Sequence, residues 1–155
     1  MEVYIHRHAA ADFKSKDEDP PVSEKGRKEA ARVVNLASER FGFKPTVIVT
    51  SPVLRAKQTG ELARKELGLK QPIIVDEHLY GDTEPSEVIK FLSRFKKEDS
   101  VVLVSHMPLV FELLYSLIGG RAEVELLNGS IAAVSFKGKA AEGKGVLEWL
   151  IQPGV

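Results

Sequence analysis

Three short apolar runs constrain the fold of this chain more than any other feature of its sequence. They cover residues 2–6, 46–51 and 100–105, and each is rich in the β-branched side chains typical of buried strands. Helical patterns separate the three runs, and strands that alternate with helices form parallel sheets. The sequence therefore predicts an α/β fold, a three-layer αβα sandwich with a mainly parallel central sheet and helices on both faces.

The segments between and after these runs complete the expected topology. Apolar residues at helical spacing predict four helices, over 24–41, from the end of the second apolar run to about 67, over 84–95 and over 108–118. A short strand is predicted at 72–75. Ser23 is a typical N-cap, Gly42 a typical helix end, and Pro52 and Pro108 are expected in first helical turns. The C-terminal part predicts a β-rich tail with strands at 123–127, 131–136 and 146–151, and Asn128-Gly129 predicts a hairpin. Because no linker or repeat interrupts the chain, we expect residues 1–155 to form one domain.

Basic residues follow each of the three predicted core strands. Arg7 and His8 end the first, Arg55 comes shortly after the second, and His106 follows the third. The carboxyl ends of parallel strands meet at one edge of a sheet, where ligands of α/β proteins bind. Helix N-termini at the same edge favour anions, so the pattern predicts a site for a phosphoryl group.

Composition excludes several functional classes. Lys and Arg together number 22, as do Asp and Glu, and a net charge of zero disfavours a nucleic-acid-binding protein. The absence of cysteine excludes disulfides and thiol nucleophiles. No apolar run approaches the roughly 20 residues that a membrane-spanning helix needs, and the chain opens with a strand instead of a signal peptide. We therefore expect a cytoplasmic protein with no membrane partner.

The motifs around the basic residues resemble those of a known family. The segments that carry the resemblance are Arg7-His8, Ser51-Pro52-x-x-Arg55-Ala56-x-Gln58-Thr59, Ser105-His106 and Pro21-Val22-Ser23-x-x-Gly26. Together they resemble the histidine phosphatase superfamily, which includes phosphoglycerate mutases, and most closely the small SixA-type phosphohistidine phosphatases.

The resemblance implies roles for individual residues. His8 is similar to the nucleophile that takes up the phosphoryl group, and Arg7, Arg55 and His106 are similar to its phosphate-binding partners. Glu77 stands where some members keep a proton donor. Two positions depart from the family pattern: Ala9 replaces the usual glycine, and Lys14 stands near the place of an asparagine found in many mutases.

The expected reaction needs no metal or cofactor, because arginines and a second histidine supply positive charge for phosphoryl transfer. A neutral His8 attacks phosphorus, water hydrolyses the covalent intermediate, and inorganic phosphate leaves. A protonated His106 would bind phosphate better, so we expect the site to push the pKa values of these two histidines apart.

Simpler interpretations stay open for each residue. His8 could make a strand-end hydrogen bond, Arg55 a surface ion pair, His106 a core hydrogen bond, and Glu77 could be a solvated carboxylate. His6 and His78 are expected to be packing or surface residues; a metal site built from the four histidines lacks the closely spaced ligand motifs such sites use.

Substrate class depends on access to the site. No long insertion between Thr59 and Ser100 can form a lid, and an open site admits a phosphorylated side chain of another protein, here a phosphohistidine. Residues 14–19 are interpreted as a solvated connector. The alternatives are a small-molecule phosphomonoesterase or phosphoglycerate mutase-like enzyme, and a non-catalytic phospho-ligand binding module. The sequence leaves the oligomeric state open.

Overall fold

The computed structural model describes residues 1–154, which contain one six-stranded sheet in the order β3-β2-β4-β1-β5-β6. The strands are β1 (Glu2–Arg7), β2 (Val47–Thr50), β3 (Ile74–Val75), β4 (Ser100–Ser105), β5 (Ile131–Ser135) and β6 (Val146–Ile151). The strands β3, β2, β4 and β1 are parallel, whereas β5 and β6 are antiparallel to their neighbours. The predicted mainly parallel sheet with a β tail is confirmed.

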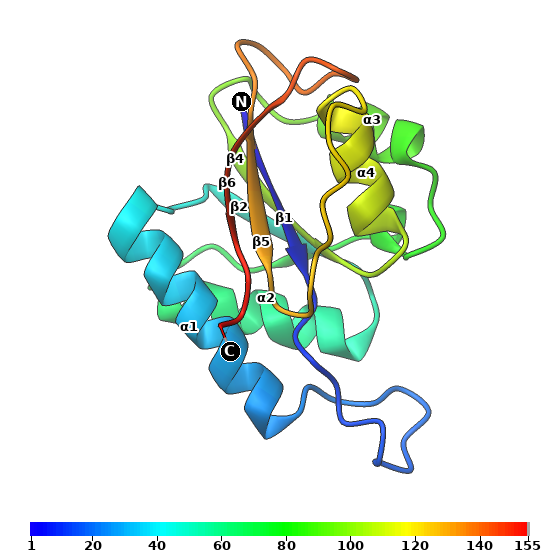
Figure 1. Ribbon diagram of the computed structural model, residues 1–155. Coiled ribbons are helices and arrows are strands. Elements are labelled where there is room, and N and C mark those ends of the chain that lie inside the picture. The colour runs from blue at the N-terminus through cyan, green and yellow to red at the C-terminus, as the bar shows by residue number, and fades with distance from the viewer. Residues whose placement is uncertain (155) are drawn as a thin grey trace.

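Helices cover both faces of this sheet (Figure 1). They are α1 (Glu24–Phe41), α2 (Leu54–Glu66), α3 (Pro85–Leu92) and α4 (Leu109–Leu117), with a short 3-10 helix, η1 (Glu77–Leu79). Alternate residues of β1 point to opposite faces. Tyr4 joins the hydrophobic cluster under α1 and α2, whereas Val3 and Ile5 join the cluster under α3 and α4. The three-layer αβα sandwich is therefore confirmed.

The caps of α1 follow the sequence prediction. The Ser23 hydroxyl accepts a hydrogen bond from the Gly26 N–H, and Gly42 ends the helix with a φ of 63°. A residue with positive φ at this position satisfies the last carbonyls of the helix, and glycine adopts it at little cost.

The prediction of a strand at 123–127 is wrong, because this segment is irregular. Its backbone groups bind a side chain in place of a neighbouring strand: Gln152 Oε1 accepts from the Leu127 N–H at 2.8 Å, and Gln152 Nε2 donates to the Glu125 carbonyl at 2.6 Å. Leu126 is fully buried in the core. Asn128 and Gly129 therefore form a turn that leads into β5, with a φ of 82° at Gly129, and not a hairpin.

The two prolines after the core strands also lie outside the first helical turns predicted for them. Pro52 precedes Val53, the N-cap of α2, and Pro108 is itself the N-cap of α4. By contrast, Pro85 does occupy the first turn of α3. Within residues 1–154, no helix has both the length and the apolar character to cross a membrane.

Candidate active site

The ends of three parallel strands bring the predicted basic residues together. Arg7 ends β1 and pairs with Ser105 at the end of β4, so His8 and His106 leave the sheet side by side. Their ring centroids are 5.0 Å apart. The strand β2 flanks β4 on its other side, and α2 after it carries Arg55 in its first turn. The structure thus brings together the four basic residues predicted from the sequence.

Hydrogen bonds determine which nitrogen of His8 carries a proton. His8 is 6% exposed, and its Nδ1 lies 2.7 Å from the Ala9 carbonyl oxygen. A carbonyl can only accept, so Nδ1 is the donor and Nε2 keeps its lone pair. The Nε–H of Arg55 donates toward this Nε2 over 3.4 Å. The unprotonated nitrogen of His8 therefore faces a guanidinium group, which can bind an anionic phosphoryl group beside it.

His106 has one ring nitrogen bound and one without a protein partner. Its Nε2 lies 2.5 Å from the Ser51 hydroxyl. Ser51 begins the motif that contains Arg55, but the sequence did not assign it to the site. Its Nδ1 is buried and finds no acceptor or donor within residues 1–154. A bound oxyanion can satisfy such a nitrogen when the ring is protonated.

Arg7 is held by a segment that is distant in the sequence. Its Nη1 donates to the Leu126 carbonyl at 2.7 Å, in the irregular segment that replaces the expected strand. Its Nε is buried and has no partner in the described chain. Burial lowers the pKa of Arg7, and the charge of Glu125 opposes this shift. The guanidinium is thus fixed by one bond and retains donors for an oxyanion.

Without a bound anion, the pKa values of the two histidines do not diverge as predicted, because both are lowered. Burial, the largest cause, lowers the pKa of His8 to about 4, with smaller contributions from the charges of His106, Arg55 and Arg7. Burial and the charge of Arg55 likewise lower the pKa of His106 to about 4. Both rings sit in the same buried cationic environment, which disfavours a further positive charge on either. Both are therefore neutral at neutral pH without an anion.

A network around Ala9 fixes the backbone that orients His8. The Ala9 N–H donates to Thr59 Oγ1 at 2.9 Å, and Thr59 Oγ1 donates to the Arg55 carbonyl at 2.8 Å. Asn128 Nδ2 donates to the His8 carbonyl at 3.3 Å. No residue other than glycine has a positive φ among residues 1–154, so Ala9 replaces the family's usual glycine without backbone strain. Thr59 and Asn128 are positioning residues that the sequence did not identify.

Asp19 lies at the start of α2, although the sequence assigned it to a solvated connector. Both oxygens of its carboxylate accept from the Leu54 N–H, at 3.1 and 3.2 Å. Its charge also raises the pKa of His106, against the larger effect of burial. Asp19 is exposed, as expected for a solvated connector, and it also stabilises the helix that carries Arg55.

Glu77 and Lys14 are not drawn into this network. Both side chains are exposed, and within residues 1–154 neither makes a hydrogen bond or salt bridge through its charged group. His78 binds the Asp76 carboxylate at 2.6 Å and stacks on Phe91. The proton-donor role of Glu77 stays a prediction.

His6 is fully buried, and burial lowers its pKa to about 4. Together with the contacts of His78, this agrees with the packing roles expected for both. Within residues 1–154, no cluster of three or more histidine and carboxylate side chains could hold a metal ion.

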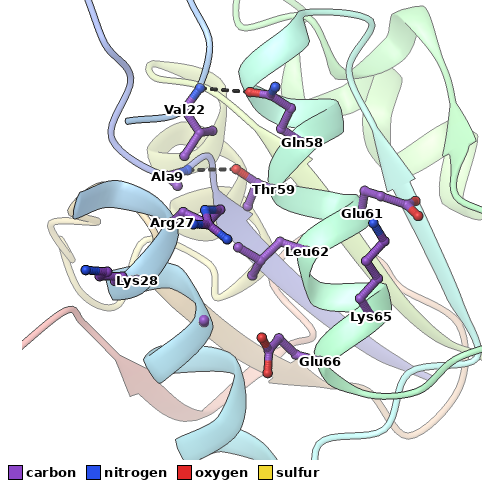
Figure 2. A pocket seen from close by; sticks show the side chains of 11 residues that line it. Ala9, Val22, Arg27, Lys28, Gln58, Thr59, Glu61, Leu62, Lys65 and Glu66 are labelled. Carbon is purple, nitrogen blue, oxygen red and sulfur yellow. Dashed lines mark hydrogen bonds between the residues drawn. The ribbon is translucent and has the colours of Figure 1, made fainter. Parts of the chain in front are cut away.

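A cavity of about 680 Å³ lies between α1 and α2 (Figure 2). The hydrogen bonds from Ala9 to Thr59 and from Val22 to Gln58 cross one end of it. None of the four basic residues lines this cavity. It adjoins the cationic site through Ala9 and Thr59.

Comparison with known proteins decides the family. The model of the histidine phosphatase superfamily (branch 1) matches residues 3–81, which include Arg7, His8 and Arg55. The chain belongs to this superfamily. Its enzymatic class is accordingly that of a phosphatase, a hydrolase, as the sequence predicted.

Individual relatives extend the superfamily match over the whole chain. Phosphohistidine phosphatase SixA of Escherichia coli (strain K12) is 30% identical over 158 residues, covering 99% of this chain and 94% of that protein. The solved structure of the protein histidine phosphatase SixA complexed with tungstate superposes with a TM-score of 0.87 at 27% identity, covering 99% and 97% of the two chains. A mycobacterial glucosyl-3-phosphoglycerate phosphatase shares the fold at 18% identity and a TM-score of 0.72, covering 99% of both chains.

Proposed function

We propose that this histidine phosphatase removes the phosphoryl group from phosphohistidine on a protein, through a covalent phospho-His8 intermediate. The observation that carries the proposal is the state of His8: its Nδ1 donates to the Ala9 carbonyl, and its unprotonated Nε2 faces the Arg55 guanidinium. This arrangement orients a neutral imidazole lone pair at the place where cationic groups bind an anion. Residues 1–155 are proposed to act as one histidine phosphatase domain.

The first chemical step transfers the phosphoryl group to the enzyme. His8 Nε2 forms a bond to phosphorus while the bond between phosphorus and the substrate imidazole breaks. The substrate ring, protonated by solvent on its other nitrogen, leaves as a neutral imidazole, and the phosphorylated His8 ring keeps its Nδ1 proton. Arg7 and Arg55 stabilise the charge on the phosphoryl oxygens. A phosphoryl dianion raises the pKa of His106, so this ring gains its proton when substrate binds and donates a hydrogen bond to an oxygen.

The second step releases the product. A water oxygen attacks phosphorus, the bond to His8 Nε2 breaks, and inorganic phosphate departs with the water's oxygen. The ring of His8 returns to its neutral form, and the Ala9 carbonyl restores the same tautomer. Thr59 and Asn128, which hold the backbone around Ala9, therefore orient His8 in both steps.

Two facts support a phosphohistidine on a protein as the substrate. The chain covers nearly the full length of phosphohistidine phosphatase SixA, so the two proteins have similar connections around the site. Between Thr59 and Ser100 the chain forms the rest of α2, the short β3, η1 and α3, with no inserted lid. An imidazole is also a better leaving group than an alkoxide. This suits a site where, among residues 1–154, no carboxylate is hydrogen-bonded to His8 or His106.

The test measures phosphate release in EDTA from a phosphohistidine-bearing protein and from small phosphomonoesters. Wild type should prefer the protein, and His8→Ala should lose release from both classes of substrate. His78→Ala is the matched control, because this histidine lies outside the site. Brief incubation with labelled substrate should give an alkali-stable, acid-labile label on wild type that His8→Ala lacks.

Equal label on His8→Ala would refute the covalent role of His8. Preference for a small ester would refute the protein substrate and keep the mechanism. The cytoplasmic location expected from the sequence stays a prediction, and cell fractionation checks it.

A further inference from the structure

Phe13 is the most exposed large apolar side chain among residues 1–154. It is 73% exposed, and its ring centroid lies 6.0 Å from Cζ of Arg55. It stands in the segment that leaves the carboxyl end of β1 and extends beyond the sheet before α1 begins (Figure 1). An aromatic ring exposed to this degree beside a catalytic arginine has apolar surface free for a binding partner.

Two more exposed apolar residues adjoin the site in the chain or through a neighbour, on other segments. Met107 directly follows His106 and is 42% exposed, and Tyr80 is 39% exposed. Tyr80 adjoins Gly81, which approaches the Met107 carbonyl and His106 Cβ so closely that a side chain at position 81 would collide with them. The Gly81 carbonyl also accepts from the Leu109 N–H at 3.2 Å. Three separate segments thus carry exposed apolar residues close in the chain, or by contact of a neighbour, to the cationic site.

The segment that carries Phe13 is held in place by hydrogen bonds. The Asp12 N–H donates to the Pro21 carbonyl at 2.8 Å, and the Asp12 side chain accepts from the Lys14 N–H at 3.1 Å. At its far end, the Asp19 carboxylate binds the N-terminus of α2. A contact residue on a pre-organised segment loses less conformational entropy when a partner binds.

The charge of this segment indicates the kind of partner. Residues 12–19 contain four carboxylates (Asp12, Asp17, Glu18 and Asp19) against two ammonium groups (Lys14 and Lys16), a net charge of two negative units. An anionic lipid surface would be repelled by this segment, whereas a protein surface with basic side chains would be attracted. Apolar groups, a cationic pocket and an acidic segment therefore match a phosphorylated protein better than a membrane.

We propose that Phe13, Met107 and Tyr80 form an apolar contact rim that binds the protein carrying the phosphohistidine. The rim fits a partner surface where apolar side chains surround the phosphorylated imidazole and basic residues lie nearby. This inference rests on the proposed function and adds the residues that distinguish a protein substrate from a small one.

The experiment compares two substrates of the same enzyme, a phosphohistidine-bearing protein and phosphoramidate. The measured quantity is the ratio of their kcat/KM values for wild type, Phe13→Ala, Met107→Ala, Glu18→Lys and Leu36→Ala. Leu36 is an exposed apolar residue on α1 at 38% exposure, so Leu36→Ala controls for the loss of a surface apolar group. We expect the ratio to fall about tenfold for Phe13→Ala, as for a central interface contact, and severalfold for Met107→Ala and Glu18→Lys. Leu36→Ala should leave the ratio within twofold of wild type.

Two results would overturn the contact rim while the proposed function survives. In the first, wild type acts on both substrates, and Phe13→Ala and Met107→Ala leave the ratio of their kcat/KM values unchanged. The other is sedimentation of wild type, but not Phe13→Ala, with phosphatidylglycerol vesicles, which would assign the exposed ring to a membrane. If wild type released phosphate from neither substrate, the proposed function would fail, and the contact rim with it.

Discussion

Replacing Thr59 with valine tests the network that orients the nucleophile. Valine has nearly the shape of threonine but cannot accept the hydrogen bond from the Ala9 N–H, which is 2.9 Å from Thr59 Oγ1. Thr59 and Ala9 are both fully buried, and valine removes the side-chain acceptor of the Ala9 N–H. Leaving a buried donor unpaired costs about 1–3 kcal/mol, and the free energy of unfolding should fall by that amount.

The same change should also lower the catalytic rate. The Ala9 carbonyl binds Nδ1 of His8, so movement of the Ala9 backbone misaligns Nε2, and small misplacements of a reacting group cost up to about 100-fold in rate. Urea unfolding gives the stability, and kcat for phosphoramidate at saturating substrate gives the rate. Thr59→Ser keeps the hydroxyl and should stay within about 1 kcal/mol and a few-fold of wild type. A Thr59→Val protein with wild-type stability and kcat would show that the hydrogen bond from the Ala9 N–H to Thr59 does not orient His8.

Three further outcomes are expected. His6, His8 and His106 have pKa values near 4 and stay neutral in the folded protein, while the unfolded chain takes up protons below about pH 6.5. The free energy of unfolding should therefore fall as pH decreases from 6.5 to 4, and added phosphate should reduce this fall. Urea unfolding at several pH values checks both expectations. Gly26→Ala should lower the midpoint of thermal unfolding by several degrees, because the new Cβ would lie 2.2 Å from the Ala10 carbonyl oxygen; unchanged melting would contradict the close approach. Asp19→Ala should lower the free energy of unfolding by about 0.5–2 kcal/mol, since it removes the acceptor of the Leu54 N–H. Asp19→Asn keeps an acceptor oxygen and should restore much of this free energy.

Local patterns in the sequence predicted much of the site. The β-branched runs place strands β1, β2 and β4, and residues directly after parallel strands must share one edge of the sheet. This is why Arg7, His8, Arg55 and His106 could be grouped without coordinates. The caps of α1 were equally predictable, because a cap depends on neighbouring residues.

Contacts between distant side chains required the tertiary structure. The segment 123–127 has the composition of a strand, but Gln152 takes its backbone hydrogen bonds and Arg7 binds its Leu126 carbonyl. Likewise, the polar composition around Asp19 indicates a solvated loop, and only the fold shows that this exposed carboxylate binds the Leu54 N–H at the start of α2.

The protonation states of the two histidines in the site also depend on the tertiary structure. Sequence reasoning assigned different charges to His8 and His106, but the fold buries both rings in one cationic pocket and lowers both pKa values. By itself, the sequence determined which residues meet at the edge of the sheet, because local periodicity sets strands and helices. Only the tertiary structure decided their tautomers, charges and positioning partners, because burial and hydrogen bonds depend on residues that are distant in the chain.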